Sequence, residues 1–229
     1  MNIFMKILAL MLFSLFLSTG CGRYRVKKEN NSYSHHMHTA HSMEDLDNQS
    51  KNTQPMLLYS YAKKDTLVNE IAPIKYKILN YINSVRSKGN TCGDSAPPLG
   101  WNTSLENAAL AHAVDMEQNK FLGHMGSGTE FDSARKGPGN GSNFYERILH
   151  YGYPVKPGEL AGEIISYTKY RIVGSQEPYA NFTHAIDNFL KSPKHCSILM
   201  NSRFHDVGIA AYKDQEKIYW VIEFAEVSY

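Results

Sequence analysis

Four histidines near the N-terminal end are the first residues whose type and spacing could do chemistry. His35, His36 and His38 surround Met37, and His41 follows closely. Imidazole is a good ligand for zinc, copper and nickel, so this cluster is a candidate metal scavenger. The alternative, which we favour because the surrounding sequence is polar, is a solvated linker with incidental metal affinity.

A second chemical feature is the cysteine that follows a histidine, Cys196 after His195. A thiol beside an imidazole is one arrangement for nucleophilic catalysis. Cys92 offers a partner, and if the protein is exported, two such cysteines favour a disulfide over a reactive thiol. Familiar enzyme motifs are absent: the sequence has no His-Glu-x-x-His and no Gly-x-Ser-x-Gly.

The first 21 residues predict export and a lipid anchor. Lys6 precedes an apolar run from Ile7 to Leu17, which is shorter than the roughly 20 residues of a membrane span and fits a signal peptide. The run ends in Leu17-Ser-Thr-Gly-Cys21, which resembles the lipobox of bacterial lipoproteins, although Ser18 replaces a larger aliphatic residue. We therefore predict a signal peptide over residues 1–20 and lipidation at Cys21. A plain signal peptide with an incidental cysteine is the alternative.

The rest of the 229-residue chain divides into a tail and one domain. Residues 21–65 are polar and lack the apolar surface needed to offset the entropy of ordering, which predicts a flexible tether. Residues 66–229 have the length of a single domain. The formal net charge of +2, without a long basic run, gives no indication of nucleic acid binding.

Hydrophobic spacing predicts the elements that must position the chemistry. Apolar residues at helical spacing indicate a helix from about Pro73 to Gly89, and Thr103 with Glu106 has the form of a capping box at the start of a second. The pattern then predicts a short helix over 143–150, a strand over 160–167, a helix over 182–190 restarted at Ser192-Pro193, and strands over 207–212 and 218–224. Helices do not alternate regularly with strands, which predicts an α+β fold with an antiparallel sheet.

Over roughly residues 76–226 the order of these segments resembles the CAP family of cysteine-rich secretory proteins, also called SCP domains. The matching pieces are Asn83 with Arg86, Trp101 to Leu105, Ala109 to Met116, His124 to Gly128, Arg147 with Tyr151 to Tyr153, Gly162 with Glu163, Ser192 to Asn201, and Val207 to Ala210 with Tyr219 and Trp220. The resemblance implies an α-β-α sandwich with a small antiparallel sheet between helices. It also implies a disulfide between Cys92 and Cys196.

The resemblance further implies a cavity that gathers two histidines and two glutamates and in several members binds a divalent cation. Matched by motif, the ligand-binding and metal-binding residues are His124, Glu163 and His195, while Ser192 replaces the second glutamate. Two histidines and one carboxylate can hold zinc with water in an open position, so we expect weak binding of zinc or another divalent cation. The alternative is a buried polar network without metal.

Two other residues have structural interpretations. We expect His112 to be a hydrogen-bonded core histidine, because it shares an apolar helix face. We expect Arg147 to make an ion pair or to bind loop carbonyls.

By resemblance we expect a non-enzymatic binding module for a small apolar ligand, a lipid or a protein partner. The alternatives are a metal-assisted hydrolase that uses His124, Glu163 and His195, and a plain structural protein. Cys21 would anchor the module to a membrane outside the cytoplasm. Gly22 stands where an aspartate would mark inner-membrane retention, which favours the outer membrane in a Gram-negative cell.

Overall fold

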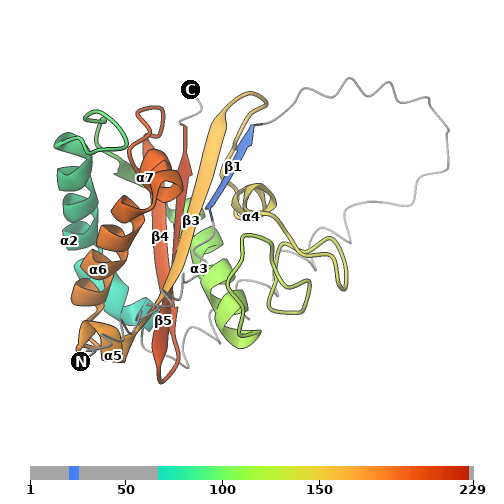
Figure 1. Ribbon diagram of the computed structural model, residues 1–229. Helices are drawn as coiled ribbons and strands as arrows, with labels where there is room; N and C mark the ends of the chain where they lie inside the picture. Colours follow the sequence, from blue (N-terminus) through green and yellow to red (C-terminus); the bar gives the residue numbers. More distant parts are fainter. Residues whose placement is uncertain (1–20, 26–66, 227–229) are drawn as a thin grey trace, which may run out of the picture.

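The computed structural model describes residues 21–25 and 67–226 (Figure 1). The predicted signal peptide, the histidine cluster and most of the predicted tether lie outside the described residues. Within the described part, no helix is long and apolar enough to cross a membrane.

A five-stranded sheet forms the middle layer, with strand order β1-β3-β5-β4-β2. The strands are β1 (Cys21–Arg25), β2 (Gly100–Trp101), β3 (Leu160–Lys169), β4 (Asp206–Lys213) and β5 (Lys217–Ala225). Neighbouring strands are antiparallel except β2 and β4, which are parallel. Apolar residues fill both faces of β5, because helices cover the sheet on both sides.

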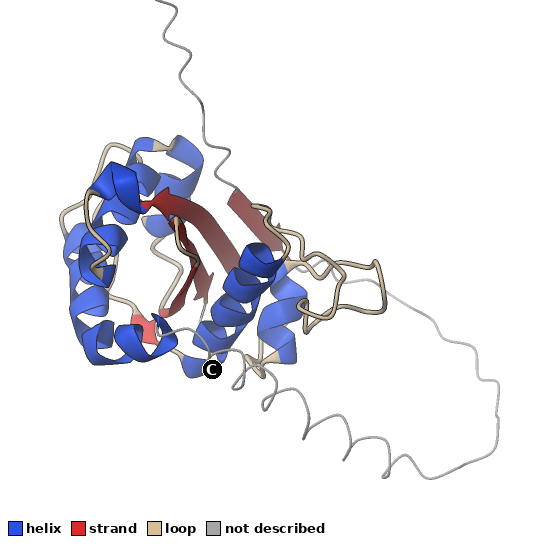
Figure 2. Cartoon of the chain, turned by 90° about the horizontal axis from the view of Figure 1, so that it is seen from below, coloured by secondary structure: helices blue, strands red, loops and turns tan. Residues whose placement is uncertain are grey.

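One layer of helices contains α2 (Leu67–Ser87), α6 (Pro178–Lys191) and α7 (Pro193–Leu199), with the short α5 (Tyr170–Val173) at its edge. The core on this side joins Ile78 of α2 and Phe189 of α6 to Ile164 and Ile222 of the sheet. The other face is covered by α3 (Thr103–Gln118) and α4 (Phe144–His150). Figure 2 shows the sheet between these two layers. The predicted α-β-α sandwich is therefore confirmed.

The start of α3 differs from the prediction. The residue that caps the helix is Asn102, whose side-chain oxygen accepts hydrogen bonds from the amides of Ser104 and Leu105. Glu106 is not part of a capping box, because its carboxylate accepts from Trp101 Nε1 at 2.6 Å and lies 3.0 Å from Lys75 Nζ. The predicted capping box at Thr103 and Glu106 is wrong.

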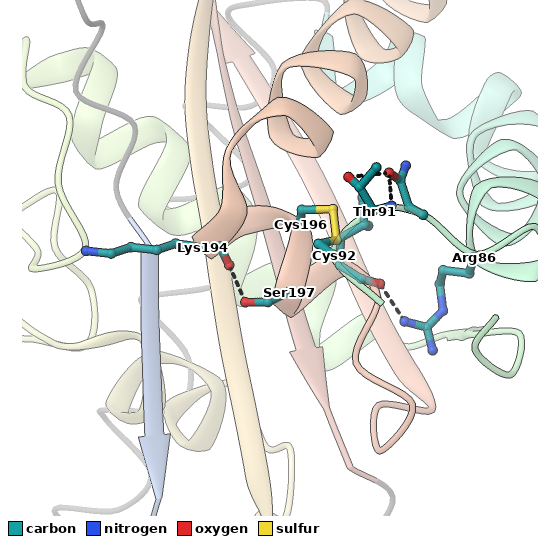
Figure 3. Close-up of a disulfide and its surroundings, with 8 residues drawn as sticks. Arg86, Thr91, Cys92, Lys194, Cys196 and Ser197 are labelled. Carbon is teal, nitrogen blue, oxygen red and sulfur yellow. Dashed lines mark hydrogen bonds between the residues drawn. A yellow bond between two sulfur atoms is a disulfide. The ribbon is translucent and has the colours of Figure 1, made fainter. Parts of the chain in front are cut away.

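The expected disulfide is confirmed. Cys92, in the loop after α2, is bonded to Cys196 in α7, with 5.9 Å between their Cα atoms (Figure 3). Arg86 reinforces the same junction: its buried guanidinium donates to the carbonyl oxygens of Pro97, Leu199 and Phe204. The loop after α2 and the end of α7 are thus held together covalently and by hydrogen bonds.

Strand β1 lies within the segment that the sequence predicts as a tether. Its five residues pair antiparallel with β3, so that Cys21 is opposite Ile164 and Arg25 is opposite Leu160. The sequence of this strand has no alternation of apolar and polar residues that would predict it. Its place at the edge of the sheet is known only from the backbone pairing with β3.

Candidate functional site

Two glutamates stand side by side on the face of the sheet that α3 and α4 cover. Glu163 of β3 is directly opposite Glu223 of β5, and both are fully buried. Residues alternate between the two faces of a strand, so this pair lies on the same side as Ile165 and Val221, which pack against α3. Two carboxyl groups in a buried row are unusual, because a buried charge is costly unless it is paired.

Glu163 is paired with two side chains. Its Oε1 lies 2.6 Å from His124 Nδ1, and its Oε2 accepts a hydrogen bond from Arg147 Nη2 at 2.7 Å. Burial alone would raise the pKa of Glu163, but the charge of Arg147 and the hydrogen bond with His124 outweigh it and lower the pKa below its usual range. Glu163 is therefore an ionised carboxylate.

His112, from the middle of α3, completes the group and matches the expected hydrogen-bonded core histidine. Its Nε2 donates to the carbonyl oxygen of Gly123 at 2.8 Å and lies 3.9 Å from Glu163 Oε2. Burial, together with the charge of Arg147, lowers the pKa of His112 to about 3. The ring is therefore neutral at physiological pH.

These side chains hold the long connection between α3 and α4, residues 119–143, which we call the site loop. It contains neither helix nor strand, and a connection of this length is uncommon unless it has a function. Arg147 donates to the carbonyl oxygens of Ser142 at 2.8 Å and His124 at 2.9 Å. Arg147 thus joins the first part of the site loop to its last part, as well as forming the ion pair with Glu163.

Two buried aspartates hold the interior of the site loop. Asp115 of α3 accepts hydrogen bonds from the amide and the hydroxyl of Ser127. Asp132, within the loop, accepts from the amide of Gly128 at 3.2 Å and from the amide of Ser142 at 2.7 Å. Hydrogen bonds to these side chains therefore fix the irregular backbone of the site loop. They also satisfy buried polar groups, which are nearly always hydrogen-bonded in native proteins.

The structure brings two of the three predicted site residues together. His124 and Glu163 are in direct contact, whereas His195 lies in α7, which packs against the opposite face of the sheet. The His195 ring contacts Phe189, a member of the core on that face, with 5.2 Å between ring centroids. The separation arises because Glu163 points toward α3 and α4, while α7 covers the other side.

These residues do not fit the expected cation. Among the described residues, no group of three or more His, Cys, Asp or Glu side chains is arranged to hold a metal ion. The carboxylate that would bind it has His124 at one oxygen and the Arg147 guanidinium at the other. A divalent cation there would be repelled by Arg147, so we derive no reaction step through a metal.

Without a metal, the reactive group of the site is the imidazole of His124, which the carboxylate of Glu163 orients. The contact at Nδ1 fixes the ring of His124, and its Nε2 has no hydrogen-bond partner among the described residues. The His124 side chain is 21% exposed, more than those of Glu163 and Arg147, although its Nε2 atom is buried.

Sequence reasoning missed Glu223 and Asp132. The signal for Glu223 was a lone charged residue in the otherwise apolar run Ile218–Phe224, since glutamate is rarely buried without a partner. Asp132 carried no comparable signal, because an aspartate in a polar loop is ordinary.

Comparison with known proteins agrees with this architecture. The family model of CAP, the cysteine-rich secretory protein family, matches residues 79–224. The chain therefore belongs to the CAP family. No curated protein sequence matches it.

Solved structures with similar chains are distant in sequence. An extracellular protein with an SCP domain from Bacillus anthracis is 21% identical over 66% of this chain and 40% of its own, with a TM-score of 0.46. An outer surface protein from Borrelia burgdorferi is 18% identical over 72% of this chain and 96% of its own, with a TM-score of 0.45. A cysteine-rich secretory protein from Staphylococcus aureus is 16% identical over 66% of this chain, with a TM-score of 0.38. This chain spans 40% of the first and 38% of the third.

Proposed function

We propose that this protein is a lipid-anchored binding module of the cell envelope, that it is not an enzyme, and that its site loop is the recognition surface. The observation that carries the proposal is that the buried polar side chains form hydrogen bonds to the backbone of the site loop. His112, Asp115, Asp132 and Arg147 each bind loop backbone, so the group serves to fix the loop. Binding residues are often found on loops that a rigid scaffold positions.

The ligand class that we propose is apolar, such as a lipid chain. Met125 follows His124 in the site loop, and 55% of its surface is exposed. Methionine is common at adaptable binding surfaces because its unbranched side chain and polarizable sulfur fit many shapes.

A titration with a fluorescent long-chain fatty acid tests the proposal. We expect binding by the full-length protein to be weakened by Met125→Ser. The matched control is Ile172→Ser in α5, because Ile172 is 56% exposed and lies outside the site loop. Equal loss in both variants, or no binding by the wild-type protein, would overturn the proposed ligand class.

The anchor is tested separately. Cells that express the full chain should incorporate labelled palmitate into the wild-type protein and not into a Cys21→Ala variant. Incorporation that persists in the variant, or that is absent from both, would contradict lipidation at Cys21.

A further inference from the structure

One carboxyl group at the site forms no hydrogen bond to the site loop. Glu223 is fully buried, and neither of its carboxyl oxygens has a hydrogen-bond partner among the described residues. An unsatisfied buried polar group carries a cost that other interactions must offset, so the presence of Glu223 in the middle of the sheet needs a physical explanation.

The position of Glu223 in the sheet limits what can surround it. Its neighbour on one side is Glu163, and its neighbour on the other is Gly208. Gly208 has no side chain, and the backbone of α3 fills the space where a Cβ would lie. Directly opposed residues in a sheet have Cβ atoms about 4.5–5.5 Å apart, so Glu163 is the group that Glu223 faces most closely.

The charged and titratable groups around this pair come from three other elements. Arg147 of α4 and His124 of the site loop contact Glu163, and neutral His112 of α3 lies beside it. Arg147 is therefore the main cation available to two carboxyl groups, and Glu163 already binds it. Two carboxylates this close cannot both ionise without strong repulsion.

We infer that Glu163 and Glu223 form a carboxyl pair that carries a single negative charge in the folded protein, with the proton on Glu223, and that this proton keeps the group that holds the site loop assembled. Burial and the neighbouring Glu163 raise the pKa of Glu223 well above its usual value, which agrees with the geometry. The proton on Glu223 removes the repulsion between the two carboxyl groups. It also leaves Glu163 as the single carboxylate that attracts Arg147. Glu223 is thus a positioning residue: it acts on the loop through Glu163 and Arg147.

The buried group also differs from the family pattern. The position of the family's second glutamate is taken by Ser192, at the start of α7. Glu223 supplies a second carboxyl group from β5, on the face where Glu163 lies. Two histidines and two glutamates are again together, but here they are His112, His124, Glu163 and Glu223.

The direct experiment is infrared difference spectroscopy on the full-length protein at neutral pH. The wild-type spectrum should contain the C=O band of a protonated carboxylic acid, and Glu223→Gln should remove it. The matched control is Glu226→Gln, which changes a partly exposed glutamate three residues later that pairs with Arg203; that substitution should leave the band in place. A wild-type protein without the band would overturn the inference.

A second readout separates the proton from simple packing. A group whose pKa is raised by folding stabilises the fold below its unfolded pKa, about 4.3, and that contribution is lost as the pH rises. The melting temperature of Glu223→Gln should therefore exceed that of wild type by an amount that widens from about pH 5 to about pH 8. A difference that is constant with pH would indicate packing alone and would contradict the inference.

The expected effect of Glu223 on ligand binding rests on the proposed function. The protonation of Glu223 does not depend on that proposal. If fatty acid binds, binding by wild type should weaken at high pH more than binding by Glu223→Gln. Absence of fatty-acid binding would count against the proposed ligand class, and the infrared band would still decide whether Glu223 is protonated.

Discussion

Nη2 of Arg147 lies 2.7 Å from Oε2 of Glu163 and 2.9 Å from the carbonyl oxygen of His124, so one nitrogen joins the sheet to the site loop. The other terminal nitrogen of Arg147 binds the carbonyl oxygen of Ser142, at the far end of the same loop. A planar group with several donors in fixed directions is suited to such a junction.

Replacement of Arg147 by methionine should destabilise the protein by about 3–5 kcal/mol, because it leaves the Glu163 carboxylate buried and without its cation. Urea denaturation measures the loss. The control is Arg203→Ala, which removes a more exposed ion pair with Glu226 and should change the stability by less than about 1 kcal/mol. Similar losses of unfolding free energy in the two variants would mean that the buried ion pair stabilises the protein no more than the exposed one.

Acid should weaken the fold through His112. The unfolded histidine titrates near pH 6.5, whereas the pKa in the folded protein is lowered to about 3. The stability contribution is therefore complete above about pH 6.5 and declines as the pH falls toward about 3, because the unfolded state takes up the proton first. In His112→Gln, the slope of unfolding free energy against pH in this window should be shallower by up to about 1.4 kcal/mol per pH unit. Parallel slopes from urea denaturation at several pH values would refute this.

Loss of the disulfide should lower the stability by about 2–5 kcal/mol, because the bond closes a long loop in the unfolded chain. Cys92 and Cys196 are 104 residues apart. The double variant Cys92→Ser, Cys196→Ser should melt at the temperature of the reduced wild-type protein, and reducing agent should not affect the variant further. A variant that melts like the oxidised wild type would contradict the prediction.

Gly208 should tolerate no side chain. A Cβ at this position would lie 2.1 Å from the amide nitrogen of Glu106 in α3, so Gly208→Ala should push the helix from the sheet and cost toward the upper end of about 1–3 kcal/mol. In the control Gly100→Ala, the nearest atom would be Asp206 Oδ1 at 3.5 Å, which is an ordinary contact. Thermal unfolding compares the two, and equal melting temperatures would disprove the close approach.

Much of the architecture is predictable from periodicity and motif order. The strand expected over 160–167 and the helix expected over 182–190 correspond to β3 and α6. The start of α3 was misjudged because Glu106 binds Trp101 and Lys75, two residues whose proximity depends on tertiary packing. The β1 strand has no hydrophobic alternation, and its pairing depends on an edge of β3 that sequence does not display.

The sequence motifs identify candidate site residues, but they do not show on which face of the sheet each residue lies. Motif matching selected His124, Glu163 and His195 as one ligand set, and in the structure the side chains of His124 and Glu163 are 2.6 Å apart. The same matching could not say that α7 covers the opposite face, which separates His195 from them. Glu223 was missed because its strand was interpreted only as an apolar run, and its meaning depends on the cross-strand register with Glu163.

The edge strand β1 begins at Cys21 and is hydrogen-bonded to β3 from its first residue. A diacylglyceryl group on that cysteine would therefore be attached to the rim of the sandwich itself. The bilayer surface and the β3 side of the domain would then be direct neighbours, and the orientation of the domain on the membrane would be set by a strand of five residues.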